Sequence, residues 1–334
     1  MPISQFLEKK IWILGVALGF LVTVLPLVVF AEGQKGTVWV ADENGNSVSV
    51  IDAATNKVLK TITGIMGPHN VQAAPDGKNV WATSGHENKT VVIDARSYKV
   101  RGSIGVGREP AHVVFTPDGK LAYVTNEEDN AVICIDTAKM KVIATIPVGR
   151  GPHGLRPSPN GKEVYVADGK DTKLSVIDVA TNKKVADIEV GKKPVQVGFS
   201  PDGKFVYFSL NGENSLGKVD VAARKLVGKV PVGRGPVQVF VTPDNRYVIV
   251  ANQGTEKDPD DTASMIDTTS FTVIATVKTD RGAHGVAVDS GGKFAYVANS
   301  LADTVSVIDI AKRKVTGTVK VGKKPNGITF APAR

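Results

Sequence analysis

A motif of apolar residues ending in aspartate recurs along the chain at nearly constant spacing. Its aspartates are Asp52, Asp94, Asp136, Asp178, Asp220, Asp267 and Asp309. Successive copies lie 42 residues apart, except that 47 residues separate the fifth copy from the sixth. A period of about 40–45 residues is typical of the four-stranded blades of a β-propeller. The sequence therefore predicts seven blades, built from residues 37–334.

Each period contains the signals for four short strands. In the third copy we expect strands at 111–116 and 121–125, a third strand that ends at Asp136, and a fourth at 142–148. These segments are rich in β-branched residues and are bounded by turn residues, such as the Pro-Asp-Gly of residues 117–119. No segment after residue 31 has helical periodicity. The chain is therefore predicted to be all-β, with antiparallel blades.

The first and last copies are incomplete in complementary ways. The first copy begins at its second strand, 37–41, whereas the last copy stops after a lone first strand, 327–331. Pairing of these two segments would complete the N-terminal blade and close the ring without an unpaired inner edge. We therefore expect one propeller domain over residues 32–334.

Residues 1–31 have the composition of a targeting segment. Lys9 and Lys10 precede the uncharged stretch 11–30, and Val29-Phe30-Ala31 has the small residues of a cleavage site. This pattern is typical of a signal peptide, although the stretch is also long enough to span a bilayer as an uncleaved anchor. Both interpretations predict export to the periplasm or the cell surface, with membrane contact only through residues 11–30 if they are retained.

Composition excludes some classes of site. The single cysteine, Cys134, lies in an apolar run, so neither an intramolecular disulfide nor a cysteine-based zinc motif is expected. There is no nucleophile elbow, no glycine-rich phosphate loop and no cysteine–histidine pair. The net charge of +8 suits an acidic partner or an anionic surface.

Short motifs in the repeats carry a family resemblance. Residues 123–126 read Tyr-Val-Thr-Asn, and close variants begin at Tyr165 and Tyr296. With the repeated Pro-Asp-Gly-Lys turn, the chain resembles the YVTN-repeat seven-bladed propellers of surface-layer and periplasmic proteins, and more distantly haem d1 and lactonase-like propellers. The resemblance implies the fold and does not specify an activity.

The connections between blades carry an unusual set of polar residues. Strand parity places these connections and the second-to-third loops at the same end of the ring. Each connection aligns on a proline, or on Ala283 in one blade, and one of the two residues that follow is an imidazole or an amide. In order round the ring these residues are Asn326, His69, His112, His153, Gln196, Gln238 and His284. They include four of the five histidines, and we expect them to line the mouth of the central channel.

A second set of residues is expected to surround this mouth. Two residues before the aligned proline or alanine, six connections carry a cation: Arg108, Arg150, Lys192, Arg234, Arg281 and Lys323. Ordinary solvation of exposed turns explains these cations equally well. No carboxylate recurs at the mouth, and Glu87, Glu127 and Glu128 are expected in outer loops. Arg156 either points into the channel or forms a structural ion pair.

Two classes of function fit this arrangement. In the favoured one, a monomeric, exported, non-catalytic scaffold binds an anionic small molecule, such as a carboxylated tetrapyrrole, or an acidic partner protein or a nucleic acid. In the alternative, His69, His112 and His153, with His284 as a candidate fourth ligand, hold a divalent metal such as zinc or copper. That metal would support lyase, hydrolase or redox chemistry.

Overall fold

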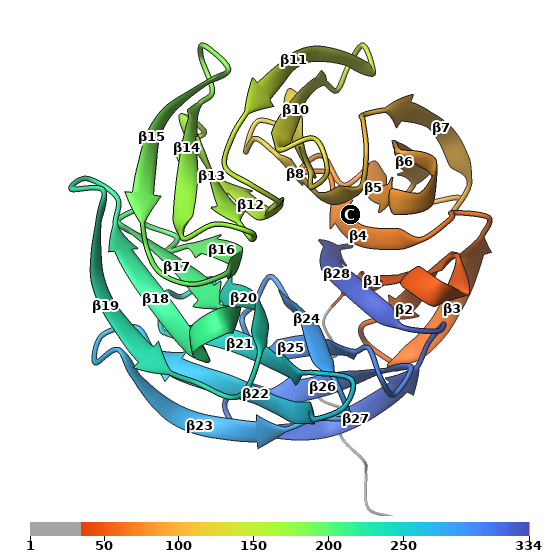
Figure 1. The fold of residues 1–334 in the computed structure, drawn as a ribbon. Coiled ribbons are helices and arrows are strands. Elements are labelled where there is room, and N and C mark those ends of the chain that lie inside the picture. The colour runs from red at the N-terminus through yellow and green to blue at the C-terminus, as the bar shows by residue number, and fades with distance from the viewer. Residues whose placement is uncertain (1–34, 334) are drawn as a thin grey trace, which may run out of the picture. The chain divides into compact units, whose positions relative to one another are not determined.

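The computed structural model describes residues 35–333, which form seven four-stranded antiparallel sheets. The sheets are arranged as blades round a central axis, so the predicted seven-bladed propeller is confirmed (Figure 1). The predicted targeting segment, residues 1–31, lies outside the described residues. Within residues 35–333, no helix has the length and apolar composition needed to cross a membrane.

Each blade runs from an inner strand at the axis to an outer strand at the rim. From inner to outer, blade 1 comprises β28 (Pro325–Pro332), β1 (Gly36–Asp42), β2 (Ser47–Asp52) and β3 (Lys57–Thr63); blade 2, β4 (Pro68–Ala73), β5 (Asn79–Ser84), β6 (Lys89–Asp94) and β7 (Val100–Gly105); blade 3, β8 (Pro110–Phe115), β9 (Leu121–Asn126), β10 (Ala131–Asp136) and β11 (Lys141–Pro147); blade 4, β12 (Pro152–Pro157), β13 (Glu163–Asp168), β14 (Lys173–Asp178) and β15 (Lys183–Glu189). Blade 5 comprises β16 (Pro194–Phe199), β17 (Phe205–Leu210), β18 (Ser215–Asp220) and β19 (Lys225–Pro231); blade 6, β20 (Pro236–Val241), β21 (Tyr247–Gly254), β22 (Pro259–Asp267) and β23 (Thr272–Lys278); blade 7, β24 (Ala283–Val288), β25 (Phe294–Asn299), β26 (Thr304–Asp309) and β27 (Lys314–Lys320). Three short 3₁₀ turns, η1 (Glu43–Gly45), η2 (Gly85–Glu87) and η3 (Asn211–Glu213), follow the second strands of blades 1, 2 and 5.

The hydrophobic core lies between neighbouring blades. Trp39 of blade 1 packs in one cluster with Val80 and Ile93 of blade 2, and Tyr123 of blade 3 packs with Leu155 of blade 4. Because each middle strand is covered on both faces, its sequence is almost continuously apolar. The outer strands are mostly exposed. A single blade cannot bury its faces alone, so the packing of successive blades stabilises the fold.

The ring is closed by the last strand. β28 pairs antiparallel with β1, with Thr37 opposite Ala331 and Trp39 opposite Thr329. In Figure 1 the blue β28 lies beside the red β1 at the axis. The predicted closure is confirmed.

Every inner strand begins with a β-bulge. In blade 2, Pro68 pairs with Ser84 and Val71 with Ala82, so that His69 and Asn70 together oppose one residue, Thr83. The same register shift follows the aligned proline or alanine of each other blade. A bulge re-aims two consecutive side chains, which explains why the polar residue stands either one or two positions after the proline.

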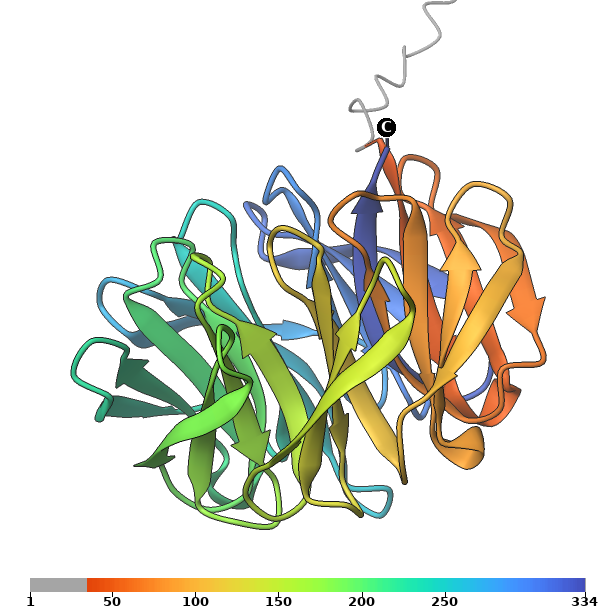
Figure 2. The ribbon, with the colours of Figure 1, turned by 90° about the horizontal axis from the view of Figure 1, so that it is seen from above.

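A hydroxyl fixes the bulge in blade 2. Thr83 Oγ1 accepts a hydrogen bond from Asn70 N–H (2.9 Å) and donates one to the carbonyl of Ala111 in the next blade (2.8 Å). Thr125 forms the same two bonds between His112 and His153 in blades 3 and 4. The start of one inner strand is thereby positioned relative to the next. Seen from the edge, the turns gather on the two faces of the ring, and these strand starts belong to one of them (Figure 2).

Candidate functional site

The turn that enters each inner strand is held by the preceding loop. Gly67 and Gly151, which precede the aligned prolines, adopt φ of 54° and 56°, a conformation that favours glycine. The amide N–H of Gly67 donates to Asn46 Oδ1 (2.9 Å), and that of Gly151 donates to Asn130 Oδ1 (2.8 Å). These bonds tie the entry into blades 2 and 4 to the loops of blades 1 and 3.

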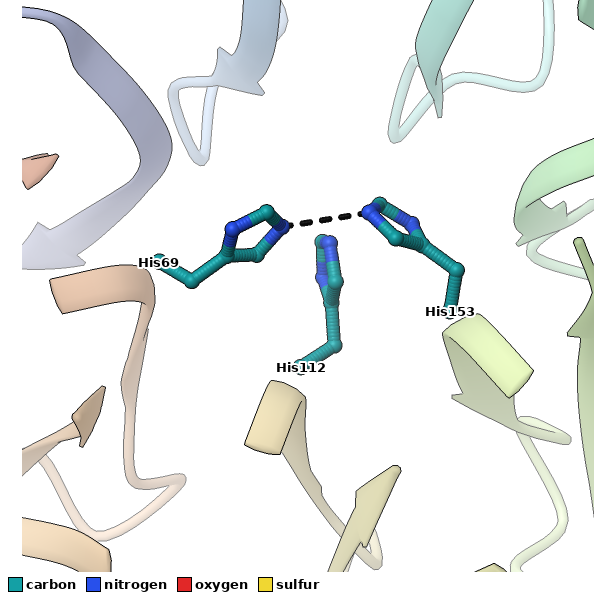
Figure 3. A group of neighbouring side chains, drawn as sticks. All are labelled: His69, His112 and His153. Carbon is teal, nitrogen blue, oxygen red and sulfur yellow. Dashed lines mark hydrogen bonds between the residues drawn. The ribbon is translucent and has the colours of Figure 1, made fainter. Parts of the chain in front are cut away.

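Three histidines converge at the channel mouth. His69, His112 and His153 come from β4, β8 and β12, and their rings point toward one another (Figure 3). The Nε2 atoms of His69 and His153 lie 3.1 Å apart. One candidate ligand atom from each of the three residues lies within 4.8 Å of the other two. We call these residues the histidine trio.

The tautomer of His153 follows from its contact with the backbone. Its Nδ1 lies 3.1 Å from the carbonyl oxygen of Val195, which can only accept a hydrogen bond. Nδ1 therefore carries the proton in the neutral ring, and Nε2 presents a lone pair to the other two histidines. A backbone carbonyl that fixes a ring in this way is typical of the outer shell of a metal site.

His69 is part of a hydrogen-bonded chain that begins at a carboxylate. The Asn326 amide donates from Nδ2 to Glu43 Oε2 (2.6 Å) and lies 3.3 Å from His69 Nδ1. With that amide as donor, His69 Nδ1 accepts and its Nε2–H donates to His153. To bind a metal through Nε2, His69 would have to carry its proton on Nδ1. The Asn326 amide would then have to rotate so that its oxygen accepts from Nδ1.

His112 has an unpartnered buried nitrogen. Its side chain is 2 % exposed, and its Nε2 has no hydrogen-bond partner. Its Nδ1 lies 3.3 Å from Gln196 Nε2, and Gln196 Oε1 accepts from the N–H of Val197. A buried polar atom without a partner is costly. With the Gln196 amide as donor, His112 Nδ1 accepts and Nε2 carries the proton. A metal ion could become the partner that Nε2 lacks only after His112 changed tautomer and the Gln196 amide turned over.

Burial keeps the rings of His69, His112 and His284 neutral. Desolvation, followed by repulsion from His153, lowers the pKa of His69 to about 4. Desolvation and the neighbouring histidines also lower the pKa of His112 and of His284 well below the usual 6.5. Neutral imidazole is the form that binds metals, so His69 and His112 need not lose a positive charge before they bind one at neutral pH.

His284 lies beside the trio, and Gln238 contacts the blade that carries His284. The rings of His284 and His69 are 6.4 Å apart between centroids, and His284 Nδ1 has no partner. Gln238 Oε1 accepts a hydrogen bond from the N–H of Val286 in the next blade (3.1 Å). The three-residue cluster that could hold a metal within residues 35–333 contains neither.

Two carboxylates reach the mouth, although the sequence placed no recurring carboxylate there. Glu127 Oε1 lies 3.7 Å from His153 Nε2, and Glu43 contacts Asn326 and Lys324. Burial raises the pKa of Glu43, but His69, Asn326 and Lys324 outweigh burial and leave this pKa below its usual range.

A backbone hydrogen bond fixes the position of both glutamates. Each follows a second strand directly, and its N–H bonds the carbonyl of the residue before an aligned proline: Glu43 to Lys324 and Glu127 to Glu109. All seven blades form this bond within the described residues. Alignment of this position along the repeats could have identified both glutamates.

The glutamates line a small pocket next to the trio. It has a volume of about 200 Å³, and its walls include Glu43, His69, His86, Glu109 and Glu127. A larger hollow of about 900 Å³ lies between the turns of blades 4 and 5 at the other end of the ring. It contains the Arg224–Glu163 ion pair and no histidine.

The six predicted cations lie on exposed interblade turns outside the trio: Arg108, Arg150, Lys192, Arg234, Arg281 and Lys323. Three of them form ion pairs on the same face, Arg108 with Asp129 (2.7 Å), Arg150 with Asp171 (3.8 Å) and Arg234 with Asp258 (3.2 Å). These pairs offset part of the positive charge. Arg156, in contrast, lies in the channel and hydrogen-bonds Gln72 Oε1 (3.1 Å).

The geometry of the trio is close to that of a tetrahedral metal site. With bonds of about 2.1 Å, a zinc ion needs its nitrogen ligands about 3.4 Å apart. The His69–His153 separation of 3.1 Å already approaches this value. The three ligand atoms lie within 4.8 Å of one another, so their separations would have to shorten by up to about 1.4 Å to complete the set, which leaves the fourth position to a water or a ligand.

Comparisons with known proteins agree with the fold. The propeller aligns with a protein of unknown function from Desulfotomaculum acetoxidans DSM 771 (TM-score 0.78, 20% identity, 90% of this chain and 100% of that one). It also aligns with hydrazine synthase of Kuenenia stuttgartiensis (0.73, 24%, 81% and 91%) and with the dihydro-heme d1 dehydrogenase NirN in complex with DHE (0.66, 13%, 88% and 74%). At these identities the likeness concerns the fold alone.

The sequence itself matches in two ways. Over 49 residues, 15% of this chain, it is 47% identical to the PE-PGRS family protein PE_PGRS18 of Mycobacterium tuberculosis (strain ATCC 25618 / H37Rv). The aligned segment spans only 10% of that protein's length. Residues 27–120, 117–202 and 196–333 match the YNCE-like beta-propeller family. Because these segments cover most of the sequence, the chain belongs to the YNCE-like beta-propeller family.

Proposed function

We propose that this propeller binds one divalent transition-metal ion, zinc or copper, through the histidine trio. The observation that carries the proposal is the buried Nε2 of His112, which has no partner beside two imidazoles whose Nε2 atoms lie 3.1 Å apart. Imidazole is a preferred ligand of both metals. The depressed histidine pKa values remove the competition from protons at neutral pH.

The space beside the trio favours a small fourth ligand. The adjoining pocket of about 200 Å³ is smaller than the ~300–1,000 Å³ typical of organic ligand sites, so it suits water or a small anion better than a tetrapyrrole.

Metal-assisted hydrolysis is the second candidate, because Glu127 lies 3.7 Å from His153 Nε2. In that role its carboxylate would accept a proton from metal-bound water. Replacement of Glu127 by Gln would then abolish turnover and leave metal binding intact.

Binding of an anionic partner by the six outer cations has weaker support. Three of these cations pair with aspartates on the same face, and exposed charges of this kind contribute little individually. They could still steer an acidic protein, a nucleic acid or a small anion toward the mouth. Export rests on the composition of residues 1–31 and is proposed on that basis alone.

The test is the zinc or copper stoichiometry and affinity of the purified chain, measured by calorimetry and elemental analysis. We expect one ion per chain in the parent protein, and binding at least about tenfold weaker in His112→Ala. His86→Ala is the matched control, because His86 is exposed on η2 of the same face. If His112→Ala binds metal as tightly as this control, the trio is structural and the proposal is wrong.

A further inference from the structure

Strands β4 and β12 touch twice across the channel. The first contact joins His69 and His153 at the mouth. Three residues further along each strand, Arg156 Nη1 donates to Gln72 Oε1 (3.1 Å). A guanidinium group therefore crosses the channel beneath the histidine trio.

Within residues 35–333, Arg156 forms no ion pair. Its single hydrogen bond within the described residues is to a neutral amide. Desolvation is the only cause that lowers its pKa, to about 10, so no carboxylate offsets its burial. The group remains cationic at neutral pH, and even a half-buried cation without a counter-charge is unfavourable. Among the described residues, the ion pair that the sequence left open is not formed.

A second donor contacts the same glutamine. Thr329 Oγ1 accepts from Gln72 Nε2 (3.4 Å) and from Ala73 N–H (3.5 Å), which leaves its hydroxyl proton to be donated. Arg156 and Gln72 are half-buried, so part of their surface is exposed, whereas Thr329 is 5 % exposed. The equivalent positions of the other inner strands carry Val114, Gly198, Phe240 and Ala287. A few polar groups on an otherwise apolar wall are typical of a ligand site.

We propose that the channel binds a small oxyanion, of carboxylate or phosphate chemistry, on Arg156 and Thr329. The planar guanidinium presents paired N–H donors that match either group, and the Thr329 hydroxyl adds a further hydrogen bond. The site uses none of the trio residues, so it does not depend on the proposed metal. A cation bound at the trio would strengthen it by adding positive charge above the anion.

The experiment measures thermal unfolding of the full chain, freed of metal on a chelating resin, with 0–50 mM inorganic phosphate or acetate at fixed ionic strength. For a dissociation constant of about 5 mM, binding raises Tm by about 3 °C. We expect this rise in the parent protein and in Arg96→Gln, a control at an exposed arginine in the turn between β6 and β7, at the other end of the ring. We expect it to be lost in Arg156→Gln.

The two anions distinguish a carboxylate site from a phosphate site. A rise in Tm with acetate alone assigns the site to carboxylates, and a rise in Tm with phosphate alone assigns it to phosphates. If Arg156→Gln does not fold, Thr329→Val carries the test, and its rise should be less than half that of the parent. The proposal is overturned if the parent responds to neither anion, or if the variants respond as strongly as the parent. Because no metal is present, neither result bears on the histidine trio.

Discussion

Replacement of His69 by Gln should make the stability difference from the parent protein depend on pH. In the folded state the pKa of His69 is about 4, against 6.5 for an unperturbed histidine. Between these pH values the unfolded chain binds a proton at this position and the folded chain does not, so acid destabilises the parent. At 1.36 kcal/mol per pH unit, the loss amounts to about 3 kcal/mol between pH 7 and pH 4.

The test compares the stability of His69→Gln with that of the parent protein, because buried carboxylates make the parent's stability depend on pH in the opposite direction. Burial raises the pKa of Asp42 to about 6 and that of Asp168 to about 7. The folded state binds protons at these carboxylates before the unfolded state does, so acid stabilises the protein through them. The parent's own stability profile therefore does not isolate His69.

The assay is urea unfolding of metal-free parent and His69→Gln at pH 7 and pH 4. His86→Gln provides the control at an exposed position. We expect the stability of His69→Gln relative to the parent to improve by about 3 kcal/mol at the lower pH. A relative stability that changes by less than about 1 kcal/mol would refute the assignment of His69 as a buried neutral base.

Three further predictions concern the closure, a buried acid and the outer cations. Deletion of residues 324–334 removes β28 and exposes the edge of β1, so calorimetry should show a lower Tm and light scattering should show aggregation, whereas unchanged unfolding would argue against closure. Asp168→Asn should stabilise the protein at pH 8 by up to about 4 kcal/mol and have no such effect at pH 3.5, because the variant lacks the carboxylate whose pKa is raised to about 7; a gain independent of pH in urea unfolding would contradict this. Joint replacement of Arg150 and Arg234 by Gln should leave unfolding almost unchanged and flatten the salt dependence of anion binding in calorimetric titrations, and an unchanged salt dependence would show that these cations are only solvated turn residues.

The fold could be predicted because its determinants are local and repeated. The aspartates from Asp52 to Asp309 fix the period, and the incomplete first and last copies fix the closure. The face that carries the trio followed from strand parity alone, since every four-stranded blade returns its loops to the same two ends of the ring.

The details of the site could not be predicted, because they depend on contacts between blades. His69 and His112 stand at different offsets from their prolines, and only the β-bulge explains how both reach the mouth. Glu43 belongs to the site through Lys324 and Asn326, which lie at the opposite end of the sequence. Arg156 lacks an ion pair because no carboxylate from any blade reaches it within residues 35–333. The sequence of one repeat cannot show this.

The closure by β28 also has a consequence for the order of folding. During synthesis β1 emerges early, but its inner neighbour follows only after the other six blades have been made. At ~5–20 residues per second, the interval between Gly36 and Pro325 is roughly 15–60 s. Throughout this interval blade 1 has only three strands and an unpaired inner edge. The closed ring therefore cannot form until β28 is made. We expect the nascent chain to need protection from aggregation until its last strand is released from the ribosome.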